Sequence, residues 1–160
     1  MMEETDSKVY IRYAQEEDLP GVYALIKELA AYEYVPDEPS VTLEEFIEDG
    51  RGDNPSYNVI VAIKDDNVVG IALYYLGYST WKGNMLYLDD LVVKNGFRGF
   101  GIGKLLFNAL VAAARDHGVN QLRWHVLSWN EPAIEFYKTL DATFDNEWLT
   151  CKIEKDKLYL

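Results

Sequence analysis

Residues Arg98-Gly99-Phe100-Gly101-Ile102-Gly103 have the types and the spacing of a phosphate-binding turn. Glycines at alternate positions, between an apolar segment and an amphipathic one, leave backbone N–H groups uncovered by side chains at the start of a helix. Such donors, together with the helix dipole, favour a phosphate. Arg98 and the following Lys104 add positive charge. The segment therefore predicts a pyrophosphate site, and a tight turn without a ligand is the alternative that glycines alone leave open.

Two common nucleotide motifs do not fit this turn. A Walker A loop requires Ser or Thr after its lysine, and Leu105 follows Lys104. The dinucleotide fingerprint requires GxGxxG, whereas the glycines here run GxGxG. Taken alone, the turn leaves nucleotides and other phosphates open.

Two adjacent carboxylates interrupt the apolar segment Leu86-Tyr87-Leu88-Asp89-Asp90-Leu91-Val92-Val93. Successive residues of a strand point to opposite faces, so Asp89 or Asp90 is expected to face a helix-covered side or a cleft. An ionised carboxylate is costly to bury without a partner. One interpretation is an acid that binds a cationic amine or relays its proton. The other is a pair in which one acid faces solvent and its neighbour accepts ordinary hydrogen bonds.

Other side chains with reactive groups give weaker indications. Tyr137 lies on a short predicted helix, where a tyrosine is usually core, although its phenol could protonate a departing thiolate. Cys151 has no evident activating partner, so a covalent route is not expected. His117 and His125 lack the spacing of metal ligands, which predicts no metal site. His125 is expected to be a strand residue with a satisfied hydrogen bond.

The elements that position these residues follow from the hydrophobic pattern. Apolar, β-branched runs predict strands at residues 9–13, 59–63, 68–75, 85–93 and 122–127, and the chain ends in strand-like residues 148–153. Helices are predicted from about Asp18, after a capping box that begins at Thr42, from Ile102 to a C-cap at Gly118, and over residues 132–140. Neighbouring strands indicate antiparallel pairing, and the strand–helix–strand unit at 85–127 indicates a parallel pair.

This order predicts one mixed α/β (α+β) domain over residues 8–160, after a disordered tail at residues 1–7. Its central sheet is expected to be mostly antiparallel, with six to seven strands flanked by helices.

Composition narrows the class of partner. The formal charge of −12 argues against binding nucleic acid and would attract cationic amines, although it also serves solubility alone. No apolar run approaches the roughly 20 residues needed to span a bilayer, so no membrane partner is expected. The polar, acidic start of the chain and its single cysteine predict a cytoplasmic protein in a reducing compartment.

Three segments together carry a resemblance to a known family: the turn at 98–103, Trp129-Asn130-Glu131-Pro132, and Phe136-Tyr137-Lys138. The chain resembles the GNAT superfamily of N-acetyltransferases over about residues 11–158. Within it, Tyr32-Glu33-Tyr34 and Tyr87-Leu88-Asp89-Asp90 are similar to the spermidine/spermine and thialysine acetyltransferases. The resemblance implies acetyl-CoA as co-substrate, in an opening between two splayed parallel strands, and a homodimer.

The resemblance also implies roles for individual residues. The backbone of Leu91, Val92 and Val93 would bond the pantetheine and thioester. The turn would hold the pyrophosphate through Arg98, Gly99, Phe100, Gly101, Ile102, Gly103 and Lys104. Asn130 would contact the cofactor near the reacting centre, and Tyr137 would protonate the thiolate. Asp89 stands where the polyamine enzymes have the acid that deprotonates the amine, and Tyr32, Glu33, Trp81 and Trp148 would line the amine site.

The sequence departs from the polyamine enzymes at two of these positions. They carry Glu where this chain has Asp89, which is one methylene shorter, and an acid where this chain has Ser79. The function expected is transfer of an acetyl group from acetyl-CoA to a primary amine of a small cationic acceptor, a polyamine or a lysine-like amino acid such as thialysine. Direct transfer in a ternary complex agrees with the missing nucleophile. A non-catalytic acyl-CoA-binding module and an acetyltransferase of protein or peptide amines are the alternatives.

Overall fold

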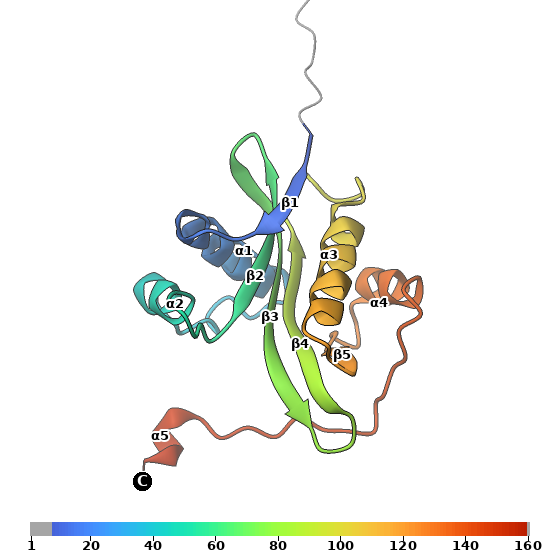
Figure 1. Ribbon diagram of the computed structural model, residues 1–160. Helices are drawn as coiled ribbons and strands as arrows, with labels where there is room; N and C mark the ends of the chain where they lie inside the picture. The colour runs from blue at the N-terminus through green and yellow to red at the C-terminus, as the bar shows by residue number, and fades with distance from the viewer. Residues whose placement is uncertain (1–7, 160) are drawn as a thin grey trace, which may run out of the picture. The chain divides into compact units, whose positions relative to one another are not determined.

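The computed structural model describes residues 8–159, so the predicted tail at 1–7 lies outside the described residues. The described chain forms two units, and the boundary between them falls after His125. The first unit holds the sheet and most of the helices (Figure 1). The second begins at Val126 and holds α4 (Glu131–Lys138) and α5 (Lys155–Leu158).

Five strands form the sheet in the order β1-β2-β3-β4-β5. They are β1 (Tyr10–Tyr13), β2 (Asn58–Lys64), β3 (Asn67–Ser79), β4 (Gly83–Val93) and β5 (Gln121–Trp124). The first three pairings are antiparallel and the last, β4 with β5, is parallel. The mostly antiparallel sheet with one parallel pair is as predicted, and the count of six to seven strands is wrong.

The strands that the sequence over-predicted lie toward the C-terminus. β5 ends at Trp124 instead of residue 127, and residues 148–153 form no strand among those the structure describes. In that segment Trp148, Leu149 and Ile153 are exposed. Apolar residues favour a strand where they pack on a pleated, half-buried surface, and here no ladder provides one. The short helix α5 that follows was not predicted.

Helices cover both faces of the sheet (Figure 1). On one face lie α1 (Leu19–Tyr32), which follows the 3-10 turn η1 (Glu16–Asp18), and α2 (Leu43–Asp49). α2 has the predicted capping box, since Thr42 Oγ1 accepts a hydrogen bond from Glu45 N and the Glu45 carboxylate accepts one from Thr42 N. The core on this face joins both helices to the sheet through Leu19, Val22, Leu25, Phe46, Val59, Val61, Ile63, Ile71, Leu73 and Val92.

The opposite face is covered by α3 (Ile102–Asp116), which packs against β2, β3 and β4. Its buried stripe is Ile102, Leu106, Leu110 and Ala113, at the three- and four-residue spacing of one helix face. Leu105, which the spacing also placed on this face, is exposed. Because α3 begins directly after the glycine turn, packing of this stripe fixes the direction in which the turn's N–H groups point.

Candidate active site

The glycine turn is an open cradle at the start of α3. Gly99 has φ +83° and Gly101 has φ +81°, values that disfavour any residue with a Cβ. A Cβ added at either glycine would meet nothing within 4 Å, so the space above the turn is open. Gly101 is the N-cap of α3, and no side chain caps the helix there. These features fit a pyrophosphate such as that of acetyl-CoA, because uncapped N–H groups need an acceptor.

Helix α1 braces this turn from the side. Arg98 Nε donates a 2.9 Å hydrogen bond to Val93 O, and its guanidinium lies 5.2 Å from the centre of the Tyr32 ring. Asn95 N donates to Glu28 Oε1 at 2.9 Å. Arg98 therefore supplies positive charge to the turn and also connects the turn to β4 and α1 through these contacts. The sequence did not indicate this second role.

The edge of β4 opens just before the turn. Its parallel pairing with β5 stops at Leu88 and Trp124. The rest of β4 pairs only with β3 among the described residues, and this stretch contains Leu91, Val92 and Val93. A strand edge without a partner presents backbone N–H and C=O groups. The three residues expected to bond pantetheine thus lie on a strand edge that β5 leaves open.

A β-bulge at Asp89 sets Asp90 and an aromatic residue on the same face of β4. Leu73 is opposite Asp90 and Tyr74 is opposite Leu88, which leaves Asp89 as the extra residue. Tyr75 is opposite Tyr87. Because Leu73 and Tyr75 are two residues apart on β3, they share a face, and so do their partners Asp90 and Tyr87. This is the face that α1 covers, since Leu73 packs in the core with Leu19, Val22 and Leu25.

The two acids and Glu33 form a cluster with shifted pKa values, called here the acid trio. Burial, together with the negative charges of Asp89 and Glu33, raises the pKa of Asp90 to about 7. Burial also raises the pKa of Asp89, whose side chain keeps access to solvent, while His125 opposes that rise. The pKa of Glu33, at the C-terminal end of α1, is raised by burial. Two negative charges that act on a buried carboxyl in this way favour a cation beside it.

Beside the acid trio lies an aromatic group of three rings, which come from β3, β4 and the residue after β5. Tyr87 stacks on Tyr75 with 5.1 Å between ring centres, and its hydroxyl is hydrogen-bonded to His125 Nδ1. The His125 ring stands nearly edge-on to Tyr87, at 5.6 Å. The predicted hydrogen bond of His125 is confirmed, but the residue follows β5 instead of lying within it. Neither Tyr75 nor Tyr87 was predicted as a site residue.

The remaining predicted acceptor residue of the first unit lies apart from this group. Trp81 is at the tip of the β3–β4 hairpin, where its backbone N donates to Ser79 Oγ at 3.3 Å. Six residues of β4 separate Gly83 from Asp89, which is roughly 20 Å at the usual rise of a strand. The structure brings Tyr32 beside Arg98 and Glu33 near Asp90, the neighbour of Asp89, and leaves Trp81 at the hairpin tip.

The second unit carries the other three predicted residues and is described by itself. Asn130 is the N-cap of α4, where its Oδ1 accepts a 3.3 Å hydrogen bond from Ala133 N. Tyr137 is in the last turn of this helix, with its ring centre 5.6 Å from that of Phe136. Trp148 is in the segment that forms no strand. Asn130 therefore also has a structural role as the cap of α4, which was not predicted from the sequence.

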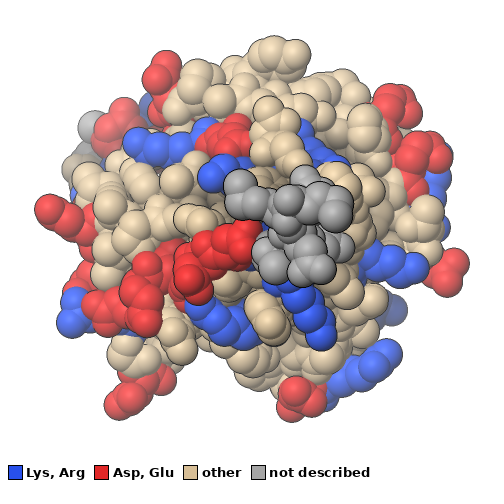
Figure 2. All heavy atoms as spheres, turned by 90° about the horizontal axis from the view of Figure 1, so that it is seen from above, with Lys and Arg blue, Asp and Glu red and all other residues tan. Residues whose placement is uncertain are grey.

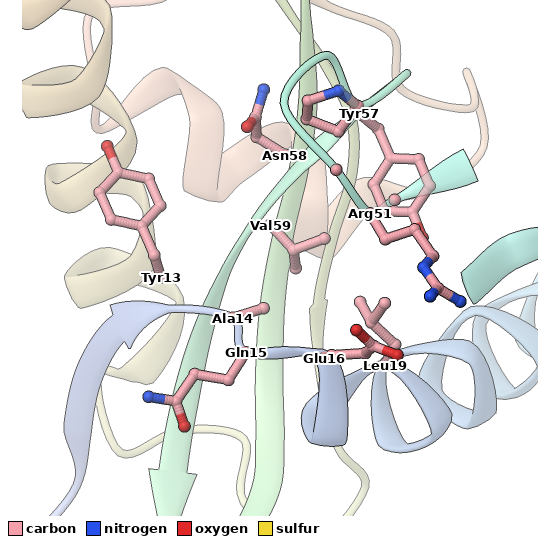
Figure 3. A pocket seen from close by; sticks show the side chains of 12 residues that line it. Tyr13, Ala14, Gln15, Glu16, Leu19, Arg51, Tyr57, Asn58 and Val59 are labelled. Atoms are coloured by element: carbon pink, nitrogen blue, oxygen red, sulfur yellow. The ribbon is translucent and has the colours of Figure 1, made fainter. Parts of the chain in front are cut away.

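None of the predicted site residues lines the hollow of about 370 Å³ drawn in Figure 3. It lies between the end of β1, the loop before β2 and the start of α1, and its labelled side chains include Tyr13, Glu16, Arg51 and Tyr57. Tyr57 is engaged there, since its hydroxyl donates a 2.5 Å hydrogen bond to Phe46 O.

Two further properties concern metals and membranes. Within residues 8–159, no three His, Cys, Asp or Glu side chains are grouped so as to hold a metal ion. Across the same described residues, every helix is too short or too polar to cross a membrane.

Comparison with known proteins identifies the family. The model of the acetyltransferase (GNAT) family matches residues 22–141, which is three quarters of the chain. The chain belongs to the GNAT family. It is an acetyl-CoA-dependent N-acetyltransferase, as the resemblance implied.

Relatives of this GNAT protein include small-molecule acetyltransferases. A thialysine N-epsilon-acetyltransferase of Bos taurus is 42% identical over 142 residues, 84% of each chain. A spermidine/spermine N(1)-acetyltransferase-like protein 1 of Homo sapiens is 33% identical over 92% of this chain and 23% of its own. Among solved structures, an integron cassette protein of V. cholerae superposes with a TM-score of 0.76, at 26% identity, over 94% of this chain and 95% of its own.

Proposed function

We propose that this GNAT protein transfers the acetyl group of acetyl-CoA to a primary amine of a small cationic acceptor, with a lysine-like amino acid such as thialysine or a polyamine as the acceptor class. The observation that carries the acceptor class is the acid trio, whose charges bear on one another at the bulge of β4. Relatives named for thialysine, at 42% and 36% identity, support the same class.

The donor end of the site follows from the turn and the open strand edge. Backbone N–H groups at Gly99–Gly103 receive the pyrophosphate, and Lys104 adds charge. The edge of β4 at Leu91, Val92 and Val93 bonds the amides of pantetheine, and Asn130 contacts the cofactor in the second unit. When bound, acetyl-CoA supplies a thioester whose carbonyl carbon accepts the amine.

The acceptor end must bind an ammonium and then remove its proton. A primary amine of the lysine type is protonated near neutral pH and cannot attack until it loses a proton. Glu33 and Asp90 hold the cation, and Asp89 is the acid nearest the open edge. Tyr137 returns a proton to the departing thiolate. Direct transfer between two bound substrates follows, since Cys151 is far along the chain from these residues and exposed.

The proposal also covers the extent of the domain, the oligomeric state and the location of the protein. The family match runs across both units, which supports one catalytic domain over residues 8–160. Exposed aromatic side chains on β1 and at the β3–β4 hairpin favour a homodimer: Tyr10, Tyr13, Tyr78 and Trp81. A cytoplasmic location is proposed from the single cysteine of the chain, which fits a reducing compartment.

Release of coenzyme A thiol across a panel of acceptors tests the function. We expect release with thialysine, lysine, spermidine, spermine or putrescine. Mass spectrometry should find the amine heavier by about 42 Da, the increase for one acetyl group. Short peptides serve as the comparison, because an enzyme for peptide amines would acetylate them faster. Absence of release with every amine, from protein that binds acetyl-CoA, would leave a non-catalytic binding module as the better description.

A further inference from the structure

His125 acts on Asp89 from the β5 side, and the proposed function above gives it no role. It is the residue after the last β4–β5 pair, Leu88 with Trp124. Asp89, the bulged residue, is the next residue on β4. The two side chains therefore start from the point where the parallel strands cease to pair, which is where the open edge begins.

Three contacts tie His125 to this position. Its Nδ1 is hydrogen-bonded to the Tyr87 hydroxyl, and its ring stands edge-on to the Tyr87 ring at 5.6 Å. Tyr87 is itself stacked on Tyr75, so the imidazole is held by a packed pair of rings. The positive form of His125 is also close enough to Asp89 to oppose the rise in the pKa of that carboxyl.

The hydrogen bond to Tyr87 engages Nδ1 of His125, so Nε2 is the ring nitrogen left to exchange a proton with a substrate. Burial and the negative charges of Asp89 and Asp90 raise the pKa of Tyr87 to about 12, so its hydroxyl stays neutral. A neutral hydroxyl can accept a hydrogen bond from Nδ1–H, and in that tautomer of His125 the lone pair lies on Nε2, the nitrogen that Tyr87 does not engage. An imidazole in that form is a proton acceptor held in a fixed orientation.

We propose that His125 accepts the proton of the acceptor ammonium, and that Asp89 stabilises the imidazolium that forms. This inference rests on the proposed function. The N–H bond of the ammonium breaks, an Nε2–H bond forms, and the electron pair left on the amine nitrogen attacks the thioester carbonyl carbon. The imidazolium then loses its proton to water. Histidine suits this step because it is the side chain used most often for general acid–base catalysis.

The pairing also accounts for the short acid at position 89. A carboxylate that must itself reach the amine gains from a longer side chain, whereas one that only faces an imidazole needs less reach. The charged and titratable groups around the pair are Asp90 and Tyr87 on β4, Tyr75 on β3, Arg123 on β5 and Glu33, the C-cap of α1. Negative charge prevails among them, which favours the protonated product of the transfer.

The activity test compares two amines in His125→Gln, a variant that keeps a hydrogen-bonding side chain and cannot take the proton. With lysine-type acceptors, kcat should fall by about 10²-fold or more, the usual contribution of a general base, while the KM for acetyl-CoA changes little. With a weakly basic primary amine that is neutral at the assay pH, the loss should shrink to a few-fold. Equal losses with both amines, or turnover within about threefold of wild type, would overturn the proposal.

Two further measurements keep the result independent of overall folding. Added imidazole should restore part of the turnover of His125→Ala, in proportion to its concentration. The matched control is His117→Gln, which changes the other histidine, at the end of α3 beside Tyr74, and should leave kcat unchanged. Failure of imidazole to restore any turnover would count against proton transfer at this position.

A titration of Asp89 separates this proposal from the proposed function. Carbon-detected NMR of the side-chain carboxyl, assigned by its loss in Asp89→Asn, follows the pKa of Asp89 without any substrate. His125→Gln should raise that pKa, because the positive charge that lowers it is gone. An unchanged pKa of Asp89 would show that the pair does not exist, even in an enzyme that acetylates amines. A raised pKa in a protein without amine acetylation would instead count against the proposed function and the proton transfer, while leaving the pair itself in place.

Discussion

At the scale of single residues, Asp89 and Asp90 have different surroundings because β4 contains one extra residue at this point. A regular strand would put Asp89 and Asp90 on opposite faces. The bulge instead leaves Asp89 at the open edge and sets Asp90 opposite Leu73, on the face covered by α1. The carboxyl whose pKa is raised to about 7 is therefore that of Asp90, although the family resemblance directs attention to its neighbour.

Asp90→Asn should weaken binding of the amine and remove its dependence on pH near 7. The raised pKa means that Asp90 is protonated below about pH 7 and carries its charge above it. Only the charged form attracts an ammonium, so in the wild type kcat/KM for the amine should rise through that range. The variant should lose about tenfold in amine kcat/KM at pH 8 and show a flatter profile between pH 6 and 8. Steady-state kinetics at saturating acetyl-CoA checks this.

The control for that experiment is Asp116→Asn, which removes an equal charge at the exposed end of α3. It should leave the profile as in wild type. A profile in Asp90→Asn that still rises near pH 7 would assign the titration to another group.

Tyr137→Phe should reduce turnover and leave the binding of acetyl-CoA nearly intact. Removal of a general acid typically costs 10²–10⁴-fold, and the phenyl ring keeps the packing of the helix. We expect kcat to fall by about 10²-fold with a dissociation constant for acetyl-CoA within about twofold of wild type, measured by calorimetry. Phe136 stands beside Tyr137 in α4, so Phe136→Leu measures the effect of altered packing in the same helix. Turnover within a few-fold of wild type in Tyr137→Phe would remove its proposed role.

At the scale of elements, the sequence predicted what depends on local pattern. The glycine turn and the capping box of Thr42 appear where residue spacing placed them, and so does the stripe of α3 except for Leu105, which is exposed. The bulge at Asp89 was not predictable, because it is a property of the register between β3 and β4 and leaves no mark in β4 alone. His125 was missed as a site residue for the same reason, since its neighbour Tyr87 lies 38 residues away in the chain.

Gly101→Ala should weaken acetyl-CoA binding by more than the backbone strain of the new alanine accounts for. At φ +81° an alanine is strained by about 1 kcal/mol, and its methyl group projects into the open space above the turn. The dissociation constant for acetyl-CoA should rise by about tenfold or more in calorimetry. Gly118→Ala is the matched control, because Gly118 also has positive φ with open space around it and follows the other end of α3. An equal change in both variants would mean that the turn does not hold the donor.

At the scale of the whole molecule, prediction succeeded for the sheet and failed at the C-terminal end of the chain. β1 to β4 pair as neighbours in sequence order, so their antiparallel arrangement follows from adjacency alone. The residues after Trp124 have apolar patterns typical of strands, but among the described residues no neighbouring strand forms backbone hydrogen bonds with them. A strand requires such a neighbour as well as an apolar pattern. Charge is the other property of the whole chain, and it is not gathered into one sign on the face drawn in Figure 2, where acidic and basic side chains are interspersed.

The net charge of −12 should make capture of the acceptor depend on salt. A negative field draws in cations, and ions screen it over about 10 Å at 0.1 M ionic strength. At saturating acetyl-CoA, kcat/KM for a dicationic amine should fall several-fold between about 20 and 300 mM NaCl, less for a monocation, and hardly at all for a neutral weak amine. Glu33→Gln tests whether the effect is local: its slope should be shallower than that of wild type if the acid trio carries the attraction. The same slope in Glu33→Gln and wild type would attribute the attraction to the summed charge of the surface, and a flat wild-type response would contradict steering altogether.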